Sequence, residues 1–347
     1  MYRLLLCLCT CGFLLSNLRA QDPDIAILGG ELYPHFLSDV QTTLENTDRF
    51  NSVSQVDVKF STPSLNTLLA YDAVLVWAGF VDTTPFFDPV LLGDTLADYV
   101  DQGGGVVMMV FSHETNSSLQ GRWENQTYWV QQTYWYTFHS TMGFLGTIHE
   151  PTHPIMRGVN AFTDGNYSYR NRTLTFSPNA IRVADWDNGY SLVVVDESHN
   201  APRVDLNFYP VSENVDSGFW DLWSDSAELM ANSLLWTIYG NAPILSFLDP
   251  VPGNPLPIHI GNMTPGNRAI ALISGVGAGP TSTPYGIVEV SQPWYKTQPR
   301  TANANGVVEF NPILPLGTSG LTLYSQAVEF LAAGGTELSN PVTFQVP

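Results

Sequence analysis

The chain has 347 residues, with 13 Lys and Arg against 32 Asp and Glu, and a formal net charge of −19 at pH 7. Nucleic-acid binding requires a basic surface that meets phosphates, so this balance excludes a nucleic-acid partner and disfavours anionic membranes. All three cysteines stand among the first eleven residues, so the rest of the chain has no thiol nucleophile and no disulfide.

The first twenty residues have the pattern of a secretory signal peptide. Arg3 precedes an apolar run from Leu4 to Leu15, and Ala20 ends a segment suited to cleavage. The run is shorter than the roughly 20 residues of a membrane-spanning helix, and no later stretch is apolar enough to span a membrane. The alternative is a buried first helix. We expect a secreted, extracellular protein with no membrane span.

Residues 22–240 alternate short apolar runs with amphipathic segments. Strands are expected at 25–28, 56–60, 73–77, 106–111, 192–195 and 204–209, and helices at 35–46, 88–101 and 226–239. This order predicts an α/β domain of the flavodoxin-like kind, with a mostly parallel sheet and helices on both faces.

Composition changes after Gly240. Residues 241–347 are rich in Pro, Gly, Thr and Asn, and turn signals separate short β-prone runs at 258–260, 269–273, 286–290, 307–310, 321–328 and 342–346. This spacing predicts a smaller all-β sandwich domain.

Three stretches of the first domain carry a family resemblance. They are the helix end, glycine run and strand at 98–107, the segment HPIMRGV at 153–159, and VDLNFYP at 204–210 with the helix after it. Together they resemble the ThuA-like branch of the class I glutamine-amidotransferase-like fold. The last domain, with LPIHI at 256–260 and LSNPVTF at 338–344, resembles C-terminal modules of secreted planctomycete-type bacterial proteins.

The resemblance implies a cysteine nucleophile after the central strand, and the sequence departs from this pattern. Ser112, His113 and Glu114 follow that strand instead. A serine nucleophile requires a base within hydrogen-bond reach, and an adjacent histidine normally points elsewhere. We therefore expect Ser112, His113, Glu114 and His153 to form a polar pocket without amidotransferase chemistry, and we assign no catalytic residue.

Residues 149–153 read HEPTH, which has the spacing of an H-E-x-x-H zinc site. Such a site needs a helix, and Pro151 and Pro154 oppose one. We expect His153 to begin a turn and His149 to be a loop residue, and we assign no metal and no cofactor.

The segment 122–139 is unusually aromatic. Core packing, a protein interface and carbohydrate binding all suit such residues. The candidates for ligand or interface contact are Trp123, Tyr128, Trp129, Tyr134, Trp135 and Tyr136.

Two further features remain open. The loop at 216–225, DSGFWDLWSD, combines carboxylates with two tryptophans, which favours a packed loop over catalysis. Asn-x-Ser/Thr sequons make candidate glycosylation sites of Asn116, Asn125, Asn166, Asn171 and Asn262 if the source is eukaryotic.

These patterns favour a secreted noncatalytic structural or interaction protein, a self-assembling surface, matrix or filament subunit whose partners are other protein subunits. The alternative is a secreted carbohydrate-binding protein or hydrolase that uses the carboxyl edge of the sheet.

Overall fold

The computed structural model describes residues 23–79, 85–114, 119–133, 138–139, 142–166, 168–172, 175–247 and 250–347. The expected signal peptide therefore lies outside the described residues. Within these ranges, no helix is both long and apolar enough to cross a membrane.

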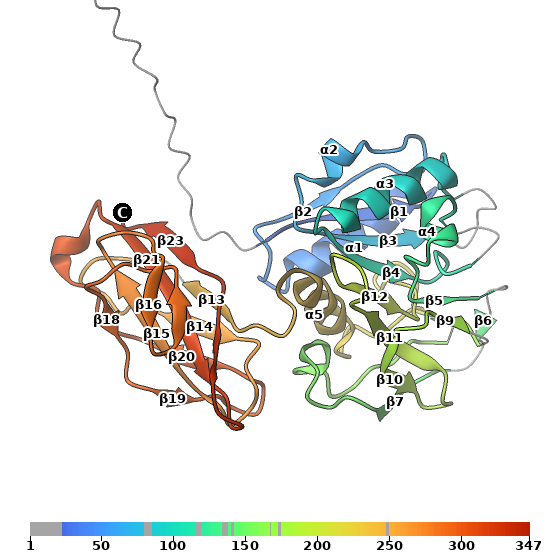
Figure 1. Ribbon diagram of the computed structural model, residues 1–347. Helices are drawn as coiled ribbons and strands as arrows, with labels where there is room; N and C mark the ends of the chain where they lie inside the picture. Colours follow the sequence, from blue (N-terminus) through green and yellow to red (C-terminus); the bar gives the residue numbers. More distant parts are fainter. Residues whose placement is uncertain are drawn as a thin grey trace, which may run out of the picture.

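The first domain is built on an eight-stranded sheet (Figure 1). Its strands are β1 (Asp24–Gly30), β2 (Ser52–Gln55), β3 (Ala73–Ala78), β4 (Gly105–Met109), β7 (Leu145–Ile148), β10 (Ile181–Trp186), β11 (Ser191–Asp196) and β12 (Arg203–Leu206). They lie in the order β2-β1-β3-β4-β12-β11-β10-β7. The first five are mutually parallel, and β11, β10 and β7 extend the sheet in antiparallel fashion.

Two groups of helices cover this sheet. One consists of α1 (Pro34–Glu45) and α5 (Ser226–Tyr239), which contact each other, and the other of α2 (Leu65–Leu68), α3 (Pro89–Asp101) and α4 (Arg122–Asn125). The crossovers β1-α1-β2 and β3-α3-β4 run in opposite directions along the sheet. Because parallel crossovers are right-handed, their helices fall on opposite faces.

The second domain is antiparallel throughout. One sheet contains β13 (Ile244–Phe247), β14 (Ile258–Gly261) and β20 (Val308–Phe310). The other contains β15 (Arg268–Ser274), β18 (Tyr295–Lys296), β19 (Arg300–Thr301), β21 (Thr322–Phe330), β22 (Thr336–Leu338) and β23 (Val342–Gln345). Ile260 and Phe310 of the first sheet share one apolar core with Ala271 and Phe344 of the second. An α/β domain followed by a smaller β domain is thus confirmed.

Short elements complete the chain. They are β5 (Gln131–Gln132), β6 (Phe138–His139), β8 (Ser168–Tyr169), β9 (Thr175–Phe176), β16 (Thr281–Thr283), β17 (Gly286–Val288) and the 3-10 turns Pro154–Met156 and Leu316–Thr318.

The expected strand at 56–60 is wrong, because β2 ends at Gln55. The Asp57 carboxylate accepts hydrogen bonds from the backbone amides of Lys59 and Phe60, at 2.8 and 2.9 Å, and so turns the chain. Val56 and Val58 are nonetheless buried, which accounts for the apolar pattern at 56–60.

Most other predicted elements of the first domain appear within a few residues. Helix α3 begins where the Asp88 side chain accepts hydrogen bonds from the amides of Val90 and Leu91. It ends before Gly103, whose φ of +93° suits glycine. Helix α5 has the predicted bounds.

Candidate functional site

The carboxyl ends of β1, β3, β4 and β12 share one edge of the sheet, because these strands are parallel. Open α/β sheets usually bind their ligands at this edge. Ser112, His113 and Glu114 follow β4 here, so the structure places three predicted pocket residues at the expected edge.

Ser112 is buried, with 2 % of its surface exposed. Its hydroxyl donates to the backbone carbonyls of Met109 and Val76, the latter at 3.2 Å. A nucleophilic serine needs its proton directed at a base, so this hydroxyl serves the turn after β4 instead.

His113 points to Asp205 of β12, and the two side chains are equally buried. The imidazole Nε2 lies 3.8 Å from a carboxylate oxygen of Asp205. Burial lowers the pKa of His113 to about 3, and burial raises the pKa of Asp205 to about 7. The histidine is therefore neutral at physiological pH and is held in the core.

Asp205 also fixes the chain beside it. One of its carboxylate oxygens accepts the backbone amides of Gln131, at 2.7 Å, and Val130, at 3.2 Å. Glu114 is buried as well and pairs with Thr133 through an isolated backbone bridge. The polar residues at this edge thus tie β4 and β12 to the segment 130–133.

Glu31 is a buried carboxylate at the same edge that sequence reasoning missed. It accepts hydrogen bonds from Trp77 Nε1, at 2.9 Å, and from the Tyr209 hydroxyl. These contacts link the ends of β1, β3 and β12. The sequence signal for this site was the pair Gly29-Gly30 before Glu31, at the end of an apolar run. The structure explains Gly29, since a Cβ there would lie 2.4 Å from the Trp77 ring.

The aromatic segment contributes to the core where it is described. Trp123 and Tyr128 are 2 % and 3 % exposed, and Trp129 packs against the same core. Burial leaves Trp123 and Tyr128 unavailable to a ligand. Tyr134, Trp135 and Tyr136 lie outside the described residues.

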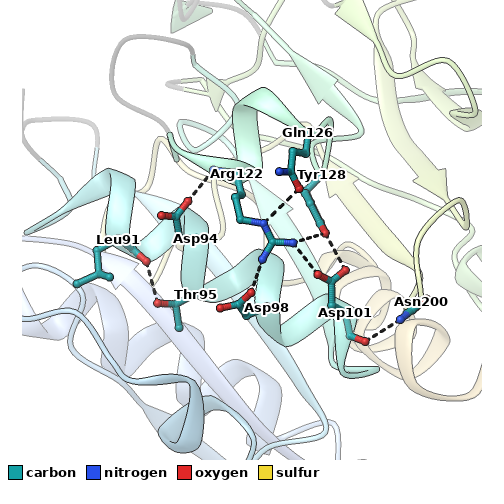
Figure 2. Close-up of polar contacts among 9 residues, drawn as sticks. All are labelled: Leu91, Asp94, Thr95, Asp98, Asp101, Arg122, Gln126, Tyr128 and Asn200. Carbon is teal, nitrogen blue, oxygen red and sulfur yellow. Dashed lines mark hydrogen bonds and ion pairs between the residues drawn. The ribbon is translucent and has the colours of Figure 1, made fainter.

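A polar cluster anchors this segment to α3, as Figure 2 shows. Arg122 forms ion pairs with Asp98 and with Asp101, the latter at 2.6 Å, and it donates to the Tyr128 hydroxyl at 2.9 Å. Partial burial opposes ionisation of Asp101, but hydrogen bonds from Tyr128 and Arg122 lower its pKa. The Arg122 amide donates to Asp94 at 2.7 Å, so the start of α4 is fixed as well.

The two histidines of the HEPTH segment have separate partners. His149 Nε2 lies 2.7 Å from an Asp185 carboxylate oxygen. His153 accepts the Ile155 amide and packs on Trp236, and burial lowers its pKa to about 4. His153 begins a turn as predicted, and it does not join Ser112, His113 and Glu114.

The loop at 216–225 holds its carboxylates in turns. Asp216 accepts the Gly218 amide, and Asp225 accepts those of Asn160 and Ala161. Trp220 is buried and donates to the Pro210 carbonyl. Trp223, expected to pack, is instead 93 % exposed.

The sequons differ in accessibility. Asn125 and Asn166 are exposed, and Asn116 lies outside the described residues. Asn171 is fully buried. Asn262 is half-buried, and its amide nitrogen donates to the carbonyls of Gly240 and Ala242. A glycan is therefore incompatible with the folded state at Asn171 and replaces structural hydrogen bonds at Asn262.

Exposed apolar side chains lie on the loops that follow β1, β3 and β12 and on the first turn of α3. The loops after β1 and β3 meet where Gly30 lies against Pro85, and the Phe36 and Phe219 rings lie 6.3 Å apart. We call this set the carboxyl-edge surface; its members are Leu32, Tyr33, Phe87, Val90, Leu91, Leu222 and Trp223, each more than 40 % exposed.

Comparison with known proteins finds similar chains among solved structures. No family model and no curated protein matches the chain. Among solved structures, it is similar to a ThuA-like protein from Parabacteroides merdae ATCC 43184, with a TM-score of 0.46 and 15 % identity over 63 % of this chain and 91 % of that one. It is also similar to the exo-β-1,4-mannosidase Op5Man5 from Opitutaceae bacterium strain TAV5, with a TM-score of 0.37 and 12 % identity over 62 % of this chain and 36 % of that one. Neither likeness carries an argument about function.

Proposed function

We propose that this protein is a secreted, noncatalytic structural subunit that associates with further copies of itself through the carboxyl-edge surface. The observation that carries the proposal is the burial pattern of the side chains at this edge. The polar side chains that follow β4 are buried in internal contacts, whereas large apolar side chains at the same edge face the solvent.

The buried polar groups argue against hydrolysis at this edge. Ser112 donates to backbone carbonyls, and His113 is neutral and 3.8 Å from Asp205. Hydrolytic catalysis by a serine needs an accessible nucleophile, a base in contact with it and a group that orients the base. The described residues of this edge do not combine these three.

The exposed apolar groups favour association. Contiguous apolar surface is uncommon on monomers and marks interaction sites, and aromatic residues dominate the energy of protein interfaces. Trp223 and Tyr33 supply such groups, at 93 % and 47 % exposure. Removal of residues 1–20 leaves 11 basic against 32 acidic residues, so copies repel each other at low ionic strength.

The sequence supports the remaining parts of the proposal. The apolar run after Arg3 and the small residue at 20 support secretion. The motifs at 98–107, 153–159 and 204–210 support a ThuA-like domain that lacks the nucleophilic cysteine. The β domain would be a sandwich module of the kind carried by secreted bacterial proteins.

Sedimentation velocity on the secreted chain tests self-association. We expect association that strengthens between 0.05 and 0.5 M NaCl, because salt screens the like charges while leaving apolar contacts intact. Tyr33→Ser with Trp223→Ser is expected to weaken association at least tenfold.

The matched control is Ile313→Ser with Leu316→Ser, since both side chains are exposed apolar groups on the β domain. It should leave association unchanged. A chain that stays monomeric at 100 μM in high salt, or equal weakening by both double variants, would refute the proposed surface.

Carbohydrate binding is the second candidate, and the exposure of Trp223 is the observation that favours it. A flat aromatic ring open to solvent suits stacking on a sugar face. A glycan array distinguishes the two: binding that Trp223→Ser abolishes, from a chain that remains monomeric, would replace the subunit proposal.

A further inference from the structure

A cleft of about 920 Å³ separates the two domains at the amino edge of the sheet, opposite the carboxyl-edge surface. The starts of β1 and β3 contribute Asp24 and Asp72, and the neighbouring loop contributes Asp48. The β domain contributes His259 of β14 and Glu309 of β20. Clefts of this size at domain interfaces are typical places for small ligands.

Hydrogen bonds between the domains fix the walls of this cleft. Asn262 of the β domain accepts from Arg157 of the α/β domain and donates to the linker carbonyls of Gly240, at 3.1 Å, and Ala242, at 2.6 Å. Within the α/β domain, Asn232 of α5 donates to the carbonyls of Ile155 and Arg157 and so positions Arg157. The contacts of Asn262 with Arg157 and with the linker carbonyls therefore join the two sides of the cleft.

Negative charge dominates the lining. Two guanidiniums face the cleft, and both are matched by carboxylates behind its walls. Arg49 lies 3.0 Å from Glu228. Arg157 is attracted by Glu329 and Glu337, although burial lowers its pKa to about 10. The carboxylates of the lining itself, at Asp24, Asp48, Asp72 and Glu309, therefore set the sign of its field.

The paired carboxylates at the sheet edge agree with this sign. The Asp24 amide donates to Asp72 at 2.9 Å, which holds the two residues together. Burial and the charge of Asp24 raise the pKa of Asp72. An added positive charge would favour the ionised form of Asp72.

Apolar side chains lie beside these charges. Leu235 and Tyr239 of α5 line one wall and are partly exposed, and Pro257 and Phe310 contribute from the β domain. A small inorganic cation makes no use of such surface, whereas a chain of methylene groups buries it. The lining thus combines several carboxylates with apolar side chains.

We propose that the interdomain cleft binds an aliphatic polyamine, with its ammonium groups at Asp48, Glu309 and the Asp24–Asp72 pair and its methylene groups against Leu235 and Tyr239. This site is on the opposite edge from the carboxyl-edge surface and is independent of self-association. Polyamines carry several positive charges joined by short alkyl chains, and the lining offers carboxylates and apolar side chains to both parts.

Isothermal titration calorimetry with spermidine tests the proposal on the secreted chain in 20 mM NaCl. We expect saturable binding at one site per chain, weakening as NaCl rises to 0.3 M. Asp48→Asn with Glu309→Gln is expected to weaken binding at least tenfold. Both side chains are exposed, so the variant should keep the wild-type melting temperature.

The control removes the same charge elsewhere, by Asp187→Asn with Glu197→Gln, two exposed residues that do not line the cleft. It should change the affinity less than twofold. Absence of saturable binding up to 5 mM spermidine, or equal weakening by both double variants, would overturn the proposal, since the second result would show attraction to the whole acidic surface.

Discussion

Arg203 and Asp196 provide the sharpest test of how the aromatic segment is held in the core. Their side chains are 0 % and 1 % exposed, and Arg203 Nη2 lies 2.6 Å from an Asp196 oxygen. Arg203 Nη1 also donates to the Tyr128 carbonyl, at 2.6 Å. The pair therefore joins β11 and β12 to the aromatic segment.

Arg203→Met leaves a buried carboxylate without its guanidinium partner. Removing one member of a buried ion pair costs about 3–5 kcal/mol of unfolding free energy. Asp196 keeps hydrogen bonds from Ser177 and from the Ser198 amide, which favours the lower half of that range. Asp196→Asn should cost a similar amount, and the double variant should cost less than the sum by about 2 kcal/mol.

Urea unfolding followed by tryptophan fluorescence measures these differences. Eight of the nine tryptophans precede residue 240, so the signal reports mainly on the α/β domain. A loss below about 1 kcal/mol in Arg203→Met, or strictly additive single variants, would show that the pair is not coupled in the core. The burial of Tyr128 beside it would then be in doubt.

Two further predictions concern pH and glycosylation. The raised pKa of Asp205 makes its contribution to stability fall as pH rises from about 4 to 7, whereas the lowered pKa of His113 makes its contribution rise from about pH 3 to 6.5. His113→Asn keeps Asp205, and Asp205→Asn keeps His113. Between pH 4 and 7, the melting temperature of His113→Asn should therefore fall relative to that of Asp205→Asn as pH rises; parallel curves would contradict the assigned pKa shifts. Expression in a host that glycosylates secreted proteins should give glycans at Asn125 and Asn166, and a Thr264→Ala variant, which removes the sequon at Asn262, should raise the folded yield. If mass spectrometry finds a glycan on Asn262 in folded protein, the hydrogen bonds assigned to Asn262 between the domains are wrong.

The pattern of apolar runs predicted the parallel half of the sheet because those strands are buried on both faces. Strand β3 is an unbroken apolar hexapeptide, and Asp88 and Gly103 bracket α3 with ordinary capping chemistry. The antiparallel strands β7 and β10 were missed. Their residues mix polar and apolar types, and the buried Asp185 pairs with Arg182 of its own strand and with His149, which follows β7.

The candidate site was harder to predict for the same physical reason. A sequence shows that Ser112 and His113 follow the central strand, but hydrogen bonds to distant backbone groups decide whether they face the solvent. Glu31 was missed because its partners, Trp77 and Tyr209, are 46 and 178 residues away. The interdomain cleft depends on segments from both domains, which no local pattern reveals.

Self-association of the secreted chain is the central claim, and sedimentation velocity across a concentration series in 0.5 M NaCl tests it most directly. The account predicts concentration-dependent oligomers that Tyr33→Ser with Trp223→Ser dissociates and Ile313→Ser with Leu316→Ser preserves. A monomer at every concentration up to 100 μM would contradict it.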